Sequence, residues 1–110
     1  MRARGDVHMA DALKGGVALV TGAASGIGAS LAVALSKHGC NLALADLNEA
    51  GLAAVRGKAA EFGVDVSTHI LDVADAAAIA ALPGDIKARH GRLSILVNNA
   101  VWRLAANSNN

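Results

Sequence analysis

The stretch LVTGAASGIG, Leu19 to Gly28, changes from an apolar run to a segment that holds three glycines. A strand that passes through a tight turn into a helix points the free N–H groups of the helix, and the positive end of its dipole, at whatever lies above the strand. Such a place suits a pyrophosphate. Gly22 can form the turn, Gly26 lets the backbone approach phosphates, and Gly28 lets the helix pack tightly on the strand.

Other interpretations of these glycines stay open at this point. A glycine-rich turn can simply connect two elements, and three glycines alone do not separate connection from phosphate binding. A mononucleotide P-loop is a weaker alternative, because no Gly-Lys-Ser/Thr sequence follows the loop. A methyltransferase would share the loop and a strand-end acid but would not explain the sequence VNNA near the end of the chain.

Apolar runs alternate with segments of helical period along the chain. The expected strands are 17–21, 41–46, 66–72 and 93–99. The first expected helix ends at Gly39 and has an apolar face that comprises Ile27, Leu31, Ala34 and Leu35. The second begins after an Asn48 cap, ends at Gly63 and turns inward Leu52, Val55, Ala59 and Phe62.

The third expected helix begins near Asp75 and ends at Gly91. Its inward residues are expected to be Ile79, Leu82 and Ile86. Pro83 and Gly84 should break or kink it into two short pieces. The strands read as continuous apolar runs, which is typical of strands covered on both faces. We therefore expect an α/β fold, a Rossmann-like doubly wound parallel sheet of order 3-2-1-4, with a ligand crevice between the first and fourth strands.

Asp46 ends the second expected strand, 18 residues after Gly28. An acidic side chain there can accept hydrogen bonds from both hydroxyls of an adenine ribose and would repel a 2′-phosphate. Its neighbours Leu47 and Asn48 carry no positive charge. This favours NAD as the cofactor over NADP. The alternative, that Asp46 caps the following helix, is compatible with that role.

Three motifs in order resemble the short-chain dehydrogenase/reductase family. They are the Thr21-Gly22-x-x-x-Gly26-x-Gly28 loop, the Asp-apolar pair in LDVAD, and ILVNNA, which is similar to the Asn-Asn-Ala-Gly of that family. The resemblance covers residues 17 to 100 and implies hydride transfer between NAD and a small alcohol or carbonyl compound. By the same resemblance, the cofactor-contacting positions are Gly22, Ser25, Gly26, Ile27, Gly28, Asp46, Leu47, Asp72, Val73, Asn99 and Ala100.

The resemblance stops at residue 101, where the family has glycine and this chain has Val101, followed by Trp102. The Ser and Tyr-x-x-x-Lys that carry proton transfer in the family have no counterpart here, and the chain has no tyrosine. We therefore expect no catalytic residue in this chain, which we interpret as the cofactor-binding part of an enzyme truncated after the fourth strand. The alternative is a non-enzymatic nucleotide-binding or interaction module.

The expected organisation is an N-terminal extension (1–15), a partial NAD-binding domain (16–100) and an atypical polar tail (101–110). A single-base deletion near codon 101 would account for the tail, and Met9 is a candidate start of translation. The histidines His38, His69 and His90 share no metal-ligand spacing, so we expect structural or solvated roles for them and no metal site. We also expect the fourth strand to leave an uncovered edge through which the chain self-associates.

The composition excludes several other classes of function. The net charge is +1 and the basic residues are scattered, which argues against a nucleic-acid partner. The apolar runs are far shorter than the roughly 20 residues of a membrane span, so we expect no membrane association. The basic N-terminus lacks the apolar core of a secretory signal, and the single cysteine, Cys40, suits a reducing compartment and a buried structural role. These features predict a cytoplasmic protein.

Overall fold

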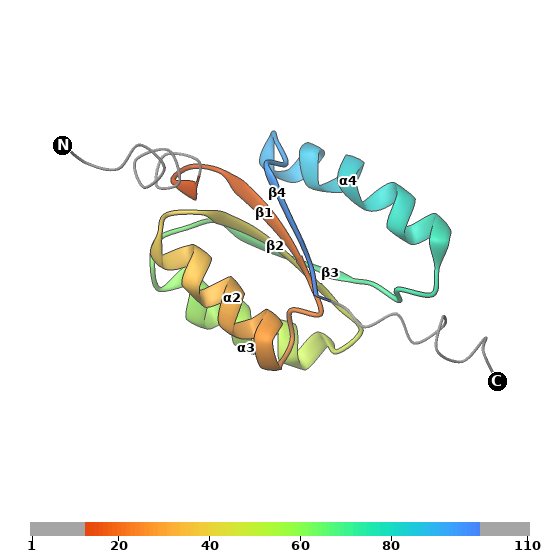
Figure 1. Ribbon diagram of the computed structural model, residues 1–110, viewed down its shortest axis with the longest axis horizontal. Helices are drawn as coiled ribbons and strands as arrows, with labels where there is room; N and C mark the ends of the chain where they lie inside the picture. The colour runs from red at the N-terminus through yellow and green to blue at the C-terminus, as the bar shows by residue number, and fades with distance from the viewer. Residues whose placement is uncertain (1–12, 100–110) are drawn as a thin grey trace.

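A computed structural model of the chain describes residues 13–99. Its strands are β1 (Val17–Thr21), β2 (Asn41–Asp46), β3 (Val66–Ile70) and β4 (Ile95–Asn98), and its helices are α2 (Gly26–Lys37), α3 (Glu49–Ala60) and α4 (Ala76–His90). The strands form one parallel sheet in the order β3-β2-β1-β4. Helices α2 and α3 cover one face and α4 covers the other, so the predicted doubly wound arrangement is confirmed (Figure 1).

The two central strands form the middle of two cores, one on each face of the sheet. All five residues of β1 are buried, as are the four inner residues of β2. Alternate side chains of these strands enter opposite cores: Leu42 and Leu44 face α2 and α3, whereas Ala43 and Ala45 face α4. The continuous apolar runs in the sequence follow from burial on both faces. Cys40 is fully buried, as expected, and its burial raises the pKa of its thiol.

The predicted inward face of α2 is wrong for three of its four residues. Ile27 is 70% exposed, Leu31 is 38% exposed and Ala34 is also exposed, whereas Leu35 is partly buried and packs against the core. The buried residues of this helix are Gly28, Ala32 and Ser36, each four positions after the last. Small side chains at this spacing let the helix lie close to β1, and the Ser36 hydroxyl is satisfied by donating to the Val33 carbonyl at 2.6 Å.

Helix α3 agrees better with its predicted pattern. The Asn48 side chain caps it by accepting from Gly51 N at 3.0 Å, and Leu52, Val55 and Ala59 are buried. Phe62 lies beyond the last turn and is 47% exposed, so its predicted inward position is wrong. The Lys37 ammonium lies 5.8 Å from the centre of its ring, which is a cation–π distance between α2 and the end of α3.

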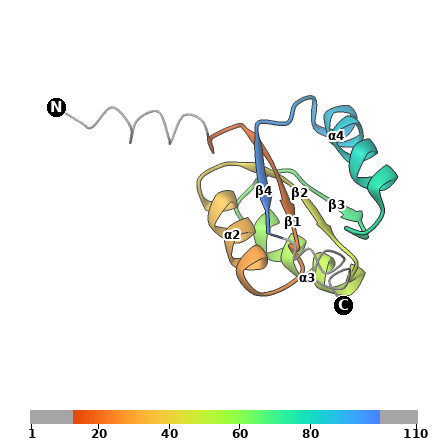
Figure 2. The same ribbon diagram turned by 45° about the vertical axis from the view of Figure 1, so that its right-hand side comes forward.

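The expected break at Pro83 and Gly84 does not occur, because α4 runs without interruption through Pro83 (Figure 2). An interior proline costs about 3 kcal/mol because it removes a hydrogen bond and crowds the preceding turn. Leu82 and Ile86, on either side of it, are both buried against β1 and β2, and burying each gives about 1.5–3 kcal/mol. Burial of Leu82 and Ile86 offsets the cost of the interior proline. The predicted helix ends at Asp75 and Gly91 are confirmed.

The outer strands are shorter than predicted. The third ends at Ile70 and the fourth spans only Ile95–Asn98. The remaining predicted residues form the turns that join these strands to α4 or lead away from the sheet. Within residues 13–99 no helix combines the length and the apolar character that crossing a membrane requires.

β4 forms one edge of the sheet that these residues build, and Leu96 on it is 62% exposed. We expect the 110-residue chain to self-associate through this edge, and Leu96→Lys to shift it toward the monomer because a charge on an edge strand opposes pairing. Sedimentation velocity measures the shift. Ile70→Lys, on the opposite edge strand and at a side chain that is 54% exposed, is the matched control and should change association less. A monomeric parent chain would contradict the prediction.

Candidate nucleotide-binding site

The glycine-rich loop connects β1 to α2 at the carboxyl edge of the sheet. Gly22 has φ +64° and Gly26 has φ +59°, a left-handed region that side-chain-bearing residues rarely adopt. The helix begins at Gly26, and the side chain of its N-cap residue Ser25 makes no capping hydrogen bond. The first-turn N–H groups of α2 are therefore not capped by Ser25, and a helix N-terminus of this kind is suited to an anionic group.

Gly28 is where the helix touches the turn. A Cβ added at Gly28 would overlap the carbonyl oxygen of Gly22 and would lie 2.8 Å from the side-chain nitrogen of Asn99. Glycine at this position therefore lets α2 start directly against both the loop and the residue that follows β4. This geometry agrees with the packing role that the sequence predicts for Gly28.

Asp46, at the end of β2, holds the loop from the other side. One carboxylate oxygen accepts from Ala24 N at 3.1 Å, and the other accepts from Asn48 N at 3.0 Å. The side chain that caps α3 is Asn48, so the predicted alternative of Asp46 as the helix cap is wrong. A carboxylate has about four acceptor positions. Two remain for further donors after these contacts.

The last residue of β4, Asn98, and the next residue, Asn99, close the site beside the loop. Asn99 N donates to the Thr21 hydroxyl at 3.0 Å, and the Asn99 side chain donates to the Gly22 carbonyl at 3.4 Å. The Thr21 hydroxyl in turn lies 3.1 Å from the side-chain oxygen of Asn98, to which it donates. The adjacent ends of β1 and β4 are thereby tied together. Of the predicted site residues, Ala100 lies outside the described part of the chain.

Asp72 and Val73 occupy the turn between β3 and α4. The Asp72 side chain accepts from Ala74 N at 2.9 Å, and its backbone carbonyl accepts from Asp75 N at 2.9 Å. Val73 packs against the α4 core. It also lines an apolar pocket of about 130 Å³ whose walls are Leu19, Thr21, Leu71, Val73, Ile79, Leu82, Pro83, Leu96 and Asn98.

Within residues 13–99 the predicted site residues therefore gather at one edge of the sheet, and two of them are apolar side chains that remain exposed. Ile27 is 70% exposed and Leu47 is 63% exposed, although each adjoins the loop or the end of β2. The sequence did not single out Gly51, where an added Cβ would lie 2.8 Å from that of Ala24. Helix α3 thus begins against the glycine-rich loop. The only sign of the Gly51–Ala24 contact in the sequence is that Gly51 lies near the start of an expected helix, as Gly28 does in the helix before it.

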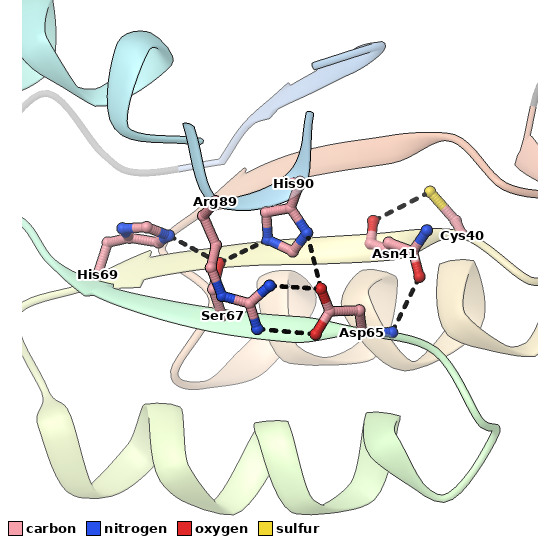
Figure 3. Close-up of polar contacts among 7 residues, drawn as sticks. All are labelled: Cys40, Asn41, Asp65, Ser67, His69, Arg89 and His90. Atoms are coloured by element: carbon pink, nitrogen blue, oxygen red, sulfur yellow. Dashed lines mark hydrogen bonds and ion pairs between the residues drawn. The ribbon is translucent and has the colours of Figure 1, made fainter. Parts of the chain in front are cut away.

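Two of the histidines make closer polar contacts than the sequence predicts. Among residues 13–99 no three His, Cys, Asp or Glu side chains are placed to hold a metal ion. His69 and His90 both contact the Ser67 hydroxyl (Figure 3). His90 also contacts the Asp65 carboxylate, which forms a salt bridge with Arg89. Burial is the main cause that lowers the pKa of His69 and of His90 below the ordinary value of 6.5.

These lowered histidine pKa values make the fold sensitive to acid. The unfolded chain binds protons at these groups from about pH 6.5 downward, whereas the folded chain resists until its lower pKa values are reached. We expect the free energy of unfolding to be highest above pH 6.5 and to fall as the pH drops through this window. Urea unfolding at a series of pH values measures the slope. His69→Gln should reduce it, whereas His38→Gln, at an exposed site, should leave it unchanged; equal slopes in all three proteins would contradict the assignment.

Comparison with known proteins identifies relatives for this arrangement. A family model described as short chain dehydrogenase matches residues 16–109. The chain is 50% identical over 97 residues to D-threitol dehydrogenase of Mycolicibacterium smegmatis, covering 84% of this chain and 36% of that protein. It is 43% identical over 88 residues to sorbitol dehydrogenase of Cereibacter sphaeroides, covering 80% and 33%. The chain thus spans about a third of the length of these two relatives.

Solved structures show the same fold. An NAD⁺-bound xylitol dehydrogenase superimposes with a TM-score of 0.78 at 31% identity, covering 82% of this chain and 35% of that one. A metagenomic short-chain oxidoreductase in complex with NADP gives a TM-score of 0.75 at 39% identity, covering 81% and 40%. The family model matches most of the chain, and the glycine-rich loop and the parallel sheet are consistent with that match. The chain belongs to the short-chain dehydrogenase family.

Proposed function

We propose that the carboxyl edge of this sheet binds a dinucleotide and that NAD is preferred over NADP. The observation that carries the preference is the position of Asp46, whose carboxylate is fixed on Ala24 N at the end of β2. An anchored carboxylate there can accept hydrogen bonds from ribose hydroxyls and would repel a 2′-phosphate. Relatives in complex with NAD and with NADP both occur, so the preference rests on this residue.

The residues present fit such a cofactor. The closeness of Gly28 to Gly22 and Asn99 leaves no room for a side chain, and the start of α2 carries no side-chain cap from Ser25. The residues proposed to hold the dinucleotide are Gly22, Ser25, Gly26, Ile27, Gly28, Asp46, Leu47, Asp72, Val73, Asn99 and Ala100. When bound, NAD supplies a hydride acceptor. The protein's own contribution at this edge is to orient the cofactor through backbone N–H groups and the Asp46 carboxylate.

For the whole enzyme to which these residues correspond, we propose hydride transfer between NAD and a small alcohol or carbonyl compound. The names of two relatives, D-threitol dehydrogenase and sorbitol dehydrogenase, support polyhydroxy alcohols as the substrate class. The alternative for the 110 residues alone is a nucleotide-binding or interaction module without turnover. Discovery of a partner chain that supplies the tyrosine and lysine of the family would favour the enzyme over the binding module.

We expect the 110-residue chain to bind NAD without forming NADH from sugar alcohols. The chain contains no tyrosine, so the family's proton-transfer residue is missing from it. Isothermal titration calorimetry measures binding, and absorbance of the reduced cofactor measures turnover with D-threitol, sorbitol and xylitol. Turnover above a protein-free control that disappears in a variant of this chain would contradict the prediction. Absence of binding by a folded chain would contradict the proposed site itself.

A further inference from the structure

A second group of polar side chains lies on the edge strand β3 and at the end of α4. Ser67 and His69 are on β3, His90 ends α4, and Asp65 directly precedes β3. The Ser67 hydroxyl oxygen lies 2.8 Å from Nε2 of His69 and 2.8 Å from Nε2 of His90. Nδ1 of His90 lies 3.3 Å from a carboxylate oxygen of Asp65. Figure 3 shows the two imidazoles on either side of the Ser67 hydroxyl, with Asp65 beyond His90.

The hydrogen atoms in this chain of contacts can be assigned by counting donors. A neutral imidazole has one N–H and one acceptor nitrogen, and a hydroxyl has one proton to donate. The Asp65 carboxylate lies 3.3 Å from Nδ1 of His90 and would repel a lone pair there, so we assign the proton of the neutral ring to Nδ1 and the acceptor role to its Nε2. The Ser67 proton therefore points to His90. His69 then completes the arrangement by donating its Nε2–H to the same Ser67 oxygen.

Burial and charge favour this protonation state. The His90 side chain is 1% exposed, and its burial lowers the pKa of the imidazole, as burial also does for His69. The charged groups that act on the two rings are Asp65, Asp85 and Arg89. Arg89 binds Asp65 through both terminal guanidinium nitrogens, at 2.5 and 2.8 Å, and this hydrogen bonding is the main cause that lowers the pKa of Asp65. The base is thus neutral and its orienting carboxylate is ionised at neutral pH.

We propose that Ser67 is a nucleophile activated by His90 and Asp65, and that it is acylated by small activated esters. The contacts are those of a nucleophile, a general base and a group that orients the base. In the reaction, Ser67 Oγ bonds to the carbonyl carbon of the ester and its proton passes to Nε2 of His90. The carbon–oxygen bond to the leaving group breaks, the leaving group departs with the electron pair, and His90 returns its proton to solvent. The product is an acyl-Ser67.

The exposure of the site sets the size of the reagent. Ser67 is 9% exposed, whereas His69 beside it is partly buried on the edge strand β3. Because so little of Ser67 is exposed, we expect only a short acyl group to reach its oxygen from this edge, whereas a bulky one would have to displace His69. The proposal concerns a single acylation and does not depend on nucleotide binding at the glycine-rich loop.

The test is to incubate the 110-residue chain with p-nitrophenyl acetate and to locate the acetyl groups by peptide mass spectrometry. Ser94 is the internal control, because it is exposed and its hydroxyl oxygen accepts from Val17 N and contacts no histidine. We expect His90→Gln to slow acetylation of Ser67 by about 10²-fold, the usual contribution of a general base. Asp65→Asn, at a side chain that is 48% exposed, should slow it by roughly tenfold. The rate should also fall at a pH below the lowered pKa of His90.

Acetylation of Ser67 that exceeds that of Ser94 and is slowed in these variants would support the proposal. Circular dichroism establishes that each variant is folded, and if His90→Gln is not, Asp65→Asn decides. An unmodified Ser67, equal rates at Ser67 and Ser94, or folded variants that react as fast as the parent would each overturn it.

Discussion

Replacing Gly28 with alanine is expected to abolish measurable NAD binding and to lower the free energy of unfolding. The new methyl group would overlap the Gly22 carbonyl oxygen and approach the Asn99 side chain to 2.8 Å. Relief requires α2 to move away from the loop, and overpacking of this kind costs about 1–3 kcal/mol. The movement would also displace the first-turn N–H groups that are proposed to meet the phosphates. Calorimetric titration with NAD and urea unfolding measure the two effects.

Gly57→Ala is the matched control for this substitution. Gly57 lies within α3, and a Cβ there would meet nothing within 4 Å. Because alanine is the better helix former, this variant should be more stable by about 0.5–1 kcal/mol and should bind NAD as the parent does. A Gly28→Ala protein with the NAD affinity and stability of the parent would contradict the prediction, because the close approach of α2 to the loop would then be needed for neither property.

Replacing Asp46 with arginine is expected to reverse the cofactor preference from NAD to NADP. The substitution removes hydrogen bonds from ribose hydroxyls to a charged acceptor, each worth about 1.5–3 kcal/mol, which corresponds to a loss of roughly tenfold or more in NAD affinity. It also replaces a charge that repels a 2′-phosphate with one that attracts it. Competition between the two cofactors in a binding titration measures the change.

Asp46→Asn separates charge from the internal contacts of this side chain. The amide oxygen of asparagine can still accept from Ala24 N or Asn48 N, which Asp46 contacts at 3.1 and 3.0 Å. We expect this variant to keep the loop in place and to discriminate less between the cofactors. Equal affinity of the parent chain for NAD and NADP would refute the role assigned to Asp46.

The elements that could be predicted from the sequence are those whose signals are local. The buried central strands are recognisable in the sequence as apolar runs. Asn48, Asp75 and Gly91 mark helix ends because each makes a capping hydrogen bond itself. The face of α2 could not be predicted from apolar periodicity, since the sheet demands small residues where the helix comes closest. The break predicted at Pro83 is wrong for a related reason. The local free-energy cost of an interior proline is outweighed by burial of neighbouring side chains against strands distant in the sequence.

The same division holds within the candidate site. The three glycines and Asp46 are visible in the sequence because their spacing resembles that of a known family. The contact between Gly51 and Ala24 and the bonds from Asn99 to Thr21 and Gly22 depend on how α3 and β4 meet the loop. No periodicity within one segment carries that information. These residues support the loop from two sides, and only the assembled fold brings them together.

The bonds from Asn99 to the loop also have a consequence for the order of folding. The Ala24–Asp46 contact joins residues only 22 positions apart, whereas the Gly22–Asn99 contact joins residues 77 positions apart. Closing the longer loop costs about 1 kcal/mol more in chain entropy, and strands paired over such distances form slowly. The β1-α2-β2 unit can therefore assemble with its loop held by Asp46 before β4 arrives. We therefore expect the candidate site to be completed last, when the fourth strand docks and Asn99 reaches the Gly22 carbonyl.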